Sequence, residues 1–190
     1  MLYYGHIVIL AIVKEIEPLL KDISKTALTS LYGAQWYQVY GKGILEGYKD
    51  FQRINNKIEA GIEPLDAMDI SALFFLFYPY ECVKKGEHLE YKTYSGAMDV
   101  IGKYYHWSEE QIRGIRRIYI IRNHAVMSRY DQDDMIPDEM YRITGKQETD
   151  WLYELEALMQ IIKPSFHLEE YRRMLAEATM KEIYRTVSCD

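Results

Sequence analysis

The stretch YGHIVILAIVKEIEPLLK, Tyr4 to Lys21, decides the fold class of this chain. Its apolar residues recur every three or four positions, as on one face of a helix: Ile9, Ile12, Val13, Ile16, Leu19 and Leu20. This spacing predicts a helix over Tyr4 to Lys21. The apolar run meets Lys14 and Glu15 before it reaches the ~20 residues that a membrane span needs, and it lacks the basic leader of a secretory signal. We therefore expect a core helix and no association with a membrane.

Helical spacing continues through the rest of the chain. The run ISALFFLFY, Ile70 to Tyr78, is apolar nearly all round, which predicts a central helix, and Asp66 or Asp69 can cap its start. The polar stretch from Lys84 to Lys92 contains a glycine and is predicted to be a surface loop. No alternation of apolar and polar residues is long enough to build a sheet. We therefore predict an all-α fold, a single-domain helical bundle of about six to eight helices over residues 1–190.

Composition narrows the class of protein. The 190 residues are 48% hydrophobic and 27% charged, so the chain can bury a core and fold by itself. The formal net charge of -6 argues against a protein that coats nucleic acid regardless of sequence, because such proteins carry a basic surplus. The two cysteines, Cys82 and Cys189, indicate neither a disulfide framework nor a zinc cluster. We expect a cytoplasmic protein without a cofactor or a metal ion.

An arginine-rich helix is predicted in the second half of the chain. Ser108 and Gln111 form the pattern of a capping box, which predicts a helix from there to about Tyr130. At ~100° per residue, one arc of this helix is apolar and is predicted to face the core: Ile112, Ile115, Tyr119 and Val126. Arg122 falls among these residues, with Asn123 beside it. Because a guanidinium amid apolar neighbours is costly unless it is paired or faces a shared cleft, Arg122 calls for an explanation.

Three donors lie on another face of the same helix. Arg113, Arg117 and His124 are one or two turns apart within a narrow arc, an arrangement that can hold a phosphate. A nearby arginine disfavours protonation of the histidine, which suits a general base near neutral pH. The alternative is a solvated basic face beside the acidic stretch Asp131 to Asp134.

Three segments resemble one branch of the HEPN superfamily, whose members are small helical bundles of prokaryotic defence, toxin–antitoxin and RNA-processing systems. In the order of that branch they are LYGAQWY at Leu31 to Tyr37, LDAMDISALFFLF at Leu65 to Phe77 and IRNHAVMSRY at Ile121 to Tyr130. The arginine followed by asparagine in the third segment is the most specific part of this resemblance.

The family motif is an arginine, a polar residue that is often asparagine, and a histidine that follows the arginine after about four to six intervening residues. Arg122 and Asn123 match the first two positions, but Met127 stands at the commonest spacing of the histidine. Arg117 and His124, with six residues between them, satisfy the looser form of the motif. The neighbours of Arg122 favour it as the aligned arginine.

The resemblance implies metal-independent cleavage of RNA at a dimer interface. In such sites arginine binds the scissile phosphate and histidine assists attack by the adjacent ribose hydroxyl, which leaves a cyclic phosphate. The candidate catalytic residues are then Arg117, Arg122, Asn123 and His124. The candidate RNA-binding residues are Arg113, Arg116 and Arg129. The implied partners are a second copy of the chain in a homodimer or higher homo-oligomer, RNA, and a protein of a defence or antitoxin system.

Two other functions stay open from the sequence. The first is a catalytically degenerate HEPN-like module that binds RNA or protein or takes part in assembly, which the missing motif histidine favours. The second is an unrelated all-α interaction protein. The first alternative keeps the phosphate-binding arginine and loses cleavage. The second needs neither a phosphate-binding arginine nor cleavage activity.

Overall fold

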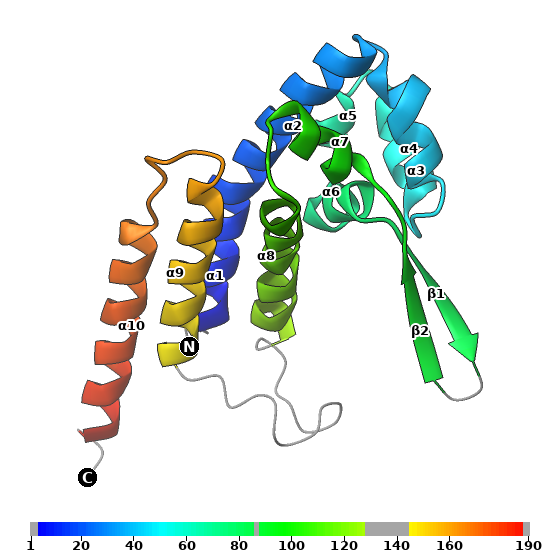
Figure 1. Ribbon diagram of the computed structural model, residues 1–190. Coiled ribbons are helices and arrows are strands. Elements are labelled where there is room, and N and C mark those ends of the chain that lie inside the picture. Colours follow the sequence, from blue (N-terminus) through cyan, green and yellow to red (C-terminus); the bar gives the residue numbers. More distant parts are fainter. Residues whose placement is uncertain (1–3, 86–87, 128–144, 188–190) are drawn as a thin grey trace. The chain divides into compact units, whose positions relative to one another are not determined.

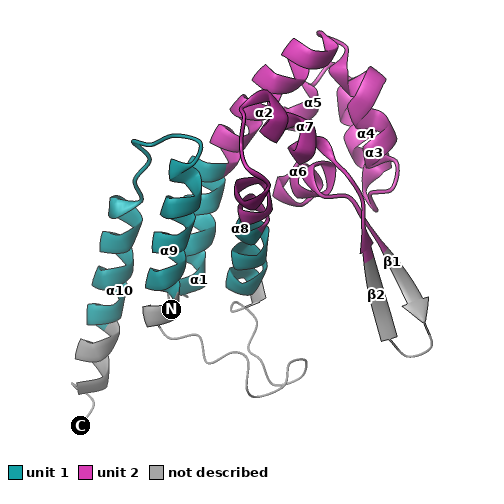
Figure 2. Cartoon of the chain, viewed as in Figure 1, with its two compact units in different colours: residues 1–16, 117–190 teal, residues 17–116 magenta. Residues whose placement is uncertain are grey.

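The computed structural model describes residues 4–85, 88–127 and 145–187, and helices make up most of them (Figure 1). The prediction of an all-α fold is confirmed. The chain forms two compact units (Figure 2), unit 1 of residues 1–16 and 117–190 and unit 2 of residues 17–116. That the whole chain is one domain stays a prediction.

The described residues of unit 1 are mostly helical. Three of its helices contact one another: α1 (Tyr4–Ala11), α9 (Gly145–Gln160) and α10 (Glu169–Val187). The unit also contains the π-helix η1 (Ile12–Ile16) and the second part of α8 (Glu109–Met127). The helix predicted from Tyr4 is confirmed, and it contains this π-helical turn. Apolar side chains from every helix of the unit are buried: Ile7, Val8, Ile12, Ile16, Ile118, Ile121, Leu152, Leu155, Met159, Leu168 and Leu175.

Unit 2 holds the shorter helices and a β-hairpin. Its helices before the hairpin are α2 (Glu17–Tyr32), η2 (Tyr37–Gly41), α3 (Lys42–Leu45), α4 (Phe51–Glu59), α5 (Pro64–Ala67) and α6 (Ile70–Phe77). After the hairpin come α7 (Ala97–Tyr104) and the first part of α8. Helix α7 contacts both α2 and α6.

Helix α6 lies in the core of unit 2, as its apolar sequence predicts. Asp69 caps it, because Oδ1 of Asp69 accepts a hydrogen bond from the backbone N–H of Ala72 at 2.9 Å. Leu73, Phe74 and Phe77 are 0%, 3% and 1% exposed. The ring of Phe74 meets that of Phe77 edge to face, with 5.6 Å between the ring centroids.

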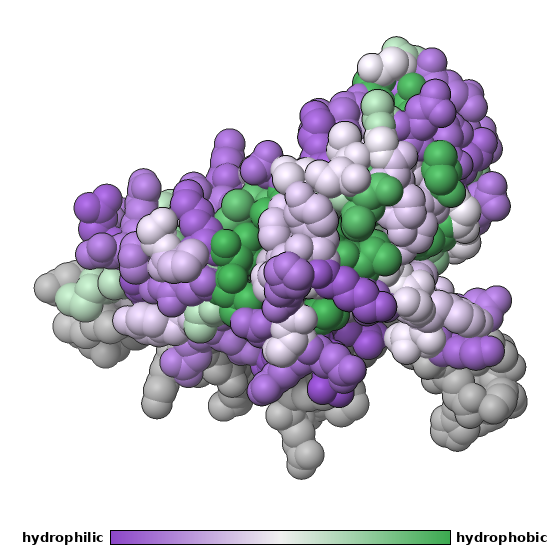
Figure 3. Space-filling view, turned by 45° about the horizontal axis from the view of Figure 1, so that its top comes forward, coloured by the Kyte–Doolittle hydropathy of each residue, from purple (hydrophilic) through white to green (hydrophobic). Residues whose placement is uncertain are grey.

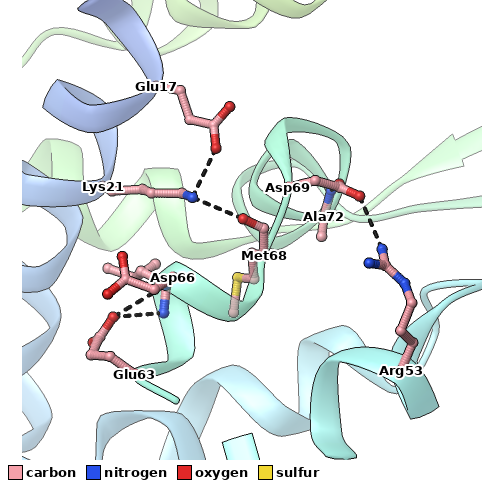
Figure 4. A network of polar contacts seen from close by, with 9 residues as sticks. Glu17, Lys21, Arg53, Glu63, Asp66, Met68, Asp69 and Ala72 are labelled. Atoms are coloured by element: carbon pink, nitrogen blue, oxygen red, sulfur yellow. Dashed lines mark hydrogen bonds and ion pairs between the residues drawn. The ribbon is translucent and has the colours of Figure 1, made fainter. Parts of the chain in front are cut away.

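Polar contacts fix the segment that leads into α6 (Figure 4). Lys21 Nζ donates to the backbone carbonyl of Met68 at 2.8 Å and forms an ion pair with Glu17 Oε1, also at 2.8 Å. Arg53 Nη2 donates to Asp69 Oδ2 at 3.0 Å. These contacts tie α2 and α4 to the start of α6, within the LDAMD segment that carries part of the resemblance.

The LYGAQWY segment ends α2 and begins the next helical turn. Gly33 has a φ of +77°, the left-handed conformation that glycine adopts without strain at a helix end. Trp36 is buried, and its ring lies so close to Gly41 that an added Cβ would come within 2.7 Å of it. A side chain at position 41 would therefore clash with the ring of Trp36.

The stretch predicted as a surface loop is a hairpin instead. Strands β1 (Tyr80–Lys85) and β2 (His88–Thr93) pair antiparallel, from Tyr80 opposite Thr93 to Lys85 opposite His88. Paired backbone groups stabilise a strand even where the sequence is polar, and a polar sequence on its own resembles a loop. The loop prediction was therefore wrong for this stretch.

Candidate phosphate-binding site on helix α8

Helix α8 starts at the capping box that its sequence predicts. The backbone N–H of Gln111 donates to Ser108 Oγ at 3.2 Å, and the backbone N–H of Ser108 donates to Gln111 Oε1 at 2.8 Å. The helix spans Glu109–Met127, and its predicted end at Tyr130 lies outside the described residues.

The buried arc of α8 differs from the predicted one. Its buried side chains are Ile115, Ile118, Ile121 and Ala125. Ile112, Tyr119 and Val126, which were predicted to face the core, are only half-buried. Apolar residues occupy two adjoining arcs of this helix, and tertiary packing selects the one that contains Ile118. Arg122 is also half-buried, so its charge is not sealed in the core.

Arg122 and Asn123 form a hydrogen-bonded pair. Nη1 of Arg122 donates to Oδ1 of Asn123 at 2.9 Å. The amide is neutral, so this bond orients the guanidinium without compensating its charge. Across residues 4–85, 88–127 and 145–187, Arg122 has no ion pair. The pair presents a positive charge at a half-buried position, which suits a phosphate or a carboxylate ligand.

Arg117 has a carboxylate partner. Its Nε donates to Oε1 of Glu154 on α9 in an ion pair. The side chains of Arg117 and Glu154 are 56% and 33% exposed, so the pair lies at the surface of unit 1. The hydrogen bond and the charge of Glu154 raise the pKa of Arg117. The charge of Arg117 is therefore compensated, unlike that of Arg122.

His124 contacts the same helix as Arg117 does. Its ring lies beside that of Trp151 on α9, with 6.1 Å between the centroids and 36° between the ring planes. Trp151 precedes Glu154 by three residues, so the two lie one turn apart along α9. The edge of α8 that carries Arg117 and His124 therefore runs along α9.

The other predicted phosphate ligands do not belong to the described part of unit 1. Arg113 and Arg116 are exposed and belong to unit 2, whereas Arg117, Arg122, Asn123 and His124 belong to unit 1. Arg129 lies outside the described residues. Of the seven candidates, the structure joins Arg122 to Asn123 directly, and it places Arg117 and His124 against α9.

A buried glutamate in unit 1 escaped the sequence analysis. Glu148 is 1% exposed, and its Oε2 has no hydrogen-bond partner among the described residues. Burial raises the pKa of this carboxyl from 4.5 to about 8. The signal in the sequence is the spacing of Glu148 with Leu152, Leu155 and Met159, which places it in the core stripe of α9.

A second glutamate of α9 organises the connection to α10. Glu156 Oε2 accepts hydrogen bonds from the backbone N–H of Leu168 at 2.5 Å and from Arg172 Nη1 at 2.7 Å. Burial acts to raise the pKa of Glu156, but these two donors outweigh it and hold the pKa below its usual value. Arg172 also lies over the ring of Tyr153, 4.6 Å from its centroid. Glu156 therefore has a structural role.

Apolar side chains reach the surface of both units. In Figure 3 green apolar patches lie between larger purple hydrophilic areas. The large apolar residues exposed in unit 1 are Leu10, Val13, Ile120, Tyr153 and Met180. In the part of the chain that the structure describes, no helix is long and apolar enough to cross a membrane. The same part contains no group of three or more histidine, cysteine, aspartate or glutamate residues placed to hold a metal ion.

Comparisons with known proteins found no matching family model, no matching curated protein and no matching solved structure.

Proposed function

We propose that this chain is a HEPN-like protein of a prokaryotic defence or RNA-processing system that binds RNA through Arg122 and Asn123. The supporting observation is the hydrogen bond from Arg122 Nη1 to Asn123 Oδ1 at 2.9 Å. This bond holds the guanidinium in place and leaves its charge for an external anion. Because Asn123 uses its oxygen in this bond, its amide N–H groups are left to donate to a phosphate oxygen.

Binding is favoured over cleavage by the surroundings of the histidine. Met127 occupies the usual position of the motif histidine. His124 lies against Trp151, and two residues of separation turn its side chain ~160° from that of Arg122. A single helix cannot aim both groups at one phosphate. The proposed protein is therefore a binding or assembly module that has lost the catalytic arrangement.

The binding form is a homodimer or a higher homo-oligomer. A symmetric dimer uses the same patch on both copies, so two half-buried Arg122 side chains can meet in one positive cleft. The exposed apolar residues of unit 1, among them Val13 at 46% and Ile120 at 41%, are the kind of surface that such an interface covers.

A second candidate is a metal-independent endoribonuclease, because His124 and Arg122 lie on the same helix of one unit. In a dimer, His124 of one copy would take the proton of the ribose 2′-hydroxyl while Arg122 of the other held the phosphate. The 2′-oxygen would attack the phosphorus, and the bond from phosphorus to the 5′-oxygen would break. One product would carry a cyclic phosphate, and the 5′-oxygen would take a proton from water and leave as the hydroxyl of the other product.

The test measures binding of a labelled single-stranded RNA of about 12 nucleotides by fluorescence anisotropy at about 50 mM salt. Arg122→Gln removes the charge but keeps an N–H donor for Asn123. Its matched control is Arg173→Gln, which removes an exposed charge on α10 of the same unit. We expect Arg122→Gln to weaken binding about ten-fold or more, because charge-assisted contacts are strong, and the control to change it less than about two-fold. Equal effects of the two variants would contradict the proposal.

The two candidates separate in a cleavage assay on the same RNA in EDTA. The binding module leaves the RNA intact. Cleavage that both His124→Ala and Arg122→Ala abolish would instead favour the endoribonuclease. Rapid cleavage that His124→Ala abolishes and that Arg122→Ala leaves untouched would favour an endoribonuclease built on Arg117 and His124.

A further inference from the structure

We infer that Glu154 competes with RNA for Arg117: its carboxylate holds the guanidinium in the free protein, and an RNA phosphate takes its place on binding. The inference rests on the proposed function and adds a second phosphate contact to it. It also assigns Glu154 as the residue that sets the strength of that contact.

The geometry of the ion pair suits an exchange of partners. Arg117 donates through Nε to Glu154, and its side chain is 56% exposed. The two terminal nitrogens of a guanidinium carry four further N–H donors, which match the oxygens of a phosphate. An incoming phosphate can therefore contact Arg117 before the carboxylate leaves.

The energetics also favour an exchange. Exposed ion pairs stabilise proteins only weakly, because water and salt screen the charges and both side chains lose freedom. Glu154 is therefore easily displaced. Its negative charge nevertheless opposes any phosphate that approaches Arg117, so it lowers the affinity for RNA.

This competition selects the class of ligand. A single phosphate gains little at Arg117, since it must replace a carboxylate that already compensates the charge. A polynucleotide held at Arg122 brings further phosphates at high local concentration, which favours the exchange. The expected ligand is therefore a strand of several nucleotides and not a mononucleotide.

The experiment repeats the RNA titration with Glu154→Gln, which removes the competing charge and keeps the shape of the side chain. The matched control is Glu177→Gln, which removes one negative charge from an exposed position on α10 of the same unit. We expect Glu154→Gln to bind RNA about three- to ten-fold more tightly than wild type, and Glu177→Gln to stay within about two-fold. The double variant Arg117→Gln/Glu154→Gln should lose this gain.

A second readout is the dependence of affinity on salt. The slope of log K against log salt should steepen by about 0.7 in Glu154→Gln, the value for one more phosphate contact on a single strand. Equal tightening by both glutamate variants would reduce the effect to net charge and overturn the inference. If Arg122→Gln weakens binding while Glu154→Gln matches Glu177→Gln, the competition is wrong and the proposed function stands. If neither wild type nor Glu154→Gln binds the RNA, both fail.

Discussion

Two arginines on helix α8 differ in the charge of their partners. Arg122 donates to the neutral amide of Asn123, whereas Arg117 donates to the carboxylate of Glu154. The sequence identifies both arginines as candidates because each fits one form of the family motif. The neighbours of Arg122 favour it as the aligned arginine, but the sequence does not reveal the partner of Arg117, because Glu154 lies 37 residues away and only the packing of α9 beside α8 brings the two together.

Glu148 is an acidic residue in the core of unit 1, at a position where an apolar side chain is usual. Its folded-state pKa of about 8 exceeds the ordinary value of 4.5, so the folded protein holds a proton that the unfolded chain releases. The stability that this proton contributes is therefore fully present below about pH 4.5, and it is lost as the pH rises through about 8.

Glu148→Gln should remove this loss. We expect the variant to be more stable than wild type at pH 8 by about 4 kcal/mol, and the two to differ by less than about 1 kcal/mol at pH 5, because a neutral amide has no proton to lose. Urea unfolding of both proteins across this range measures the difference. Curves of stability against pH that run parallel for wild type and variant would show that Glu148 is not held neutral in the folded protein.

Among the elements, those with local signals are predictable from the sequence. Seven of the eight residues of helix α6 are buried, and an aspartate caps its start. Helix α8 begins at a capping box of serine and glutamine. Both signals lie within a few residues of the helix. The hairpin β1–β2 depends on backbone pairing between two polar strands. The buried arc of α8 depends on partners elsewhere in the chain, and the sequence pattern misassigned both. The pair Arg122–Asn123 was identified because its two residues are adjacent.

Helix α6 provides the test at this scale. Phe74 is 3% exposed, so Phe74→Ala should lower the free energy of unfolding by about 3 to 5 kcal/mol through the lost burial and the cavity left behind. Val39→Ala is the control, because Val39 is 67% exposed and its truncation should cost less than about 0.5 kcal/mol. Urea melts compare the two. A loss below about 1 kcal/mol for Phe74→Ala would refute the central position of α6 in unit 2.

At the scale of the whole molecule, an acidic chain is proposed to bind RNA. The net charge of -6 works against this, so binding must come from a local positive site that salt weakens. A homodimer strengthens such a site, because a two-fold axis doubles the number of arginines around one cleft.

Oligomeric state is therefore a direct prediction. Analytical ultracentrifugation at micromolar concentration should give a dimer or a higher oligomer. Ile120→Asp introduces a charge at an exposed apolar position of α8 and should shift the protein towards monomer if this helix lies in the interface. Leu31→Asp, at an exposed apolar position of α2, is the matched control and should leave the oligomer intact. A wild-type monomer at that concentration would contradict the dimeric site.

The salt dependence of RNA affinity in wild type and Arg122→Gln tests the central claim most directly. Titrations between about 50 and 300 mM salt give the slope of log K against log salt, which counts the phosphates that the protein neutralises. We predict that Arg122→Gln flattens the slope by about 0.7 for each Arg122 in contact with the strand, while Arg173→Gln leaves it unchanged. Identical slopes for wild type and Arg122→Gln would contradict the claim that Arg122 binds an RNA phosphate.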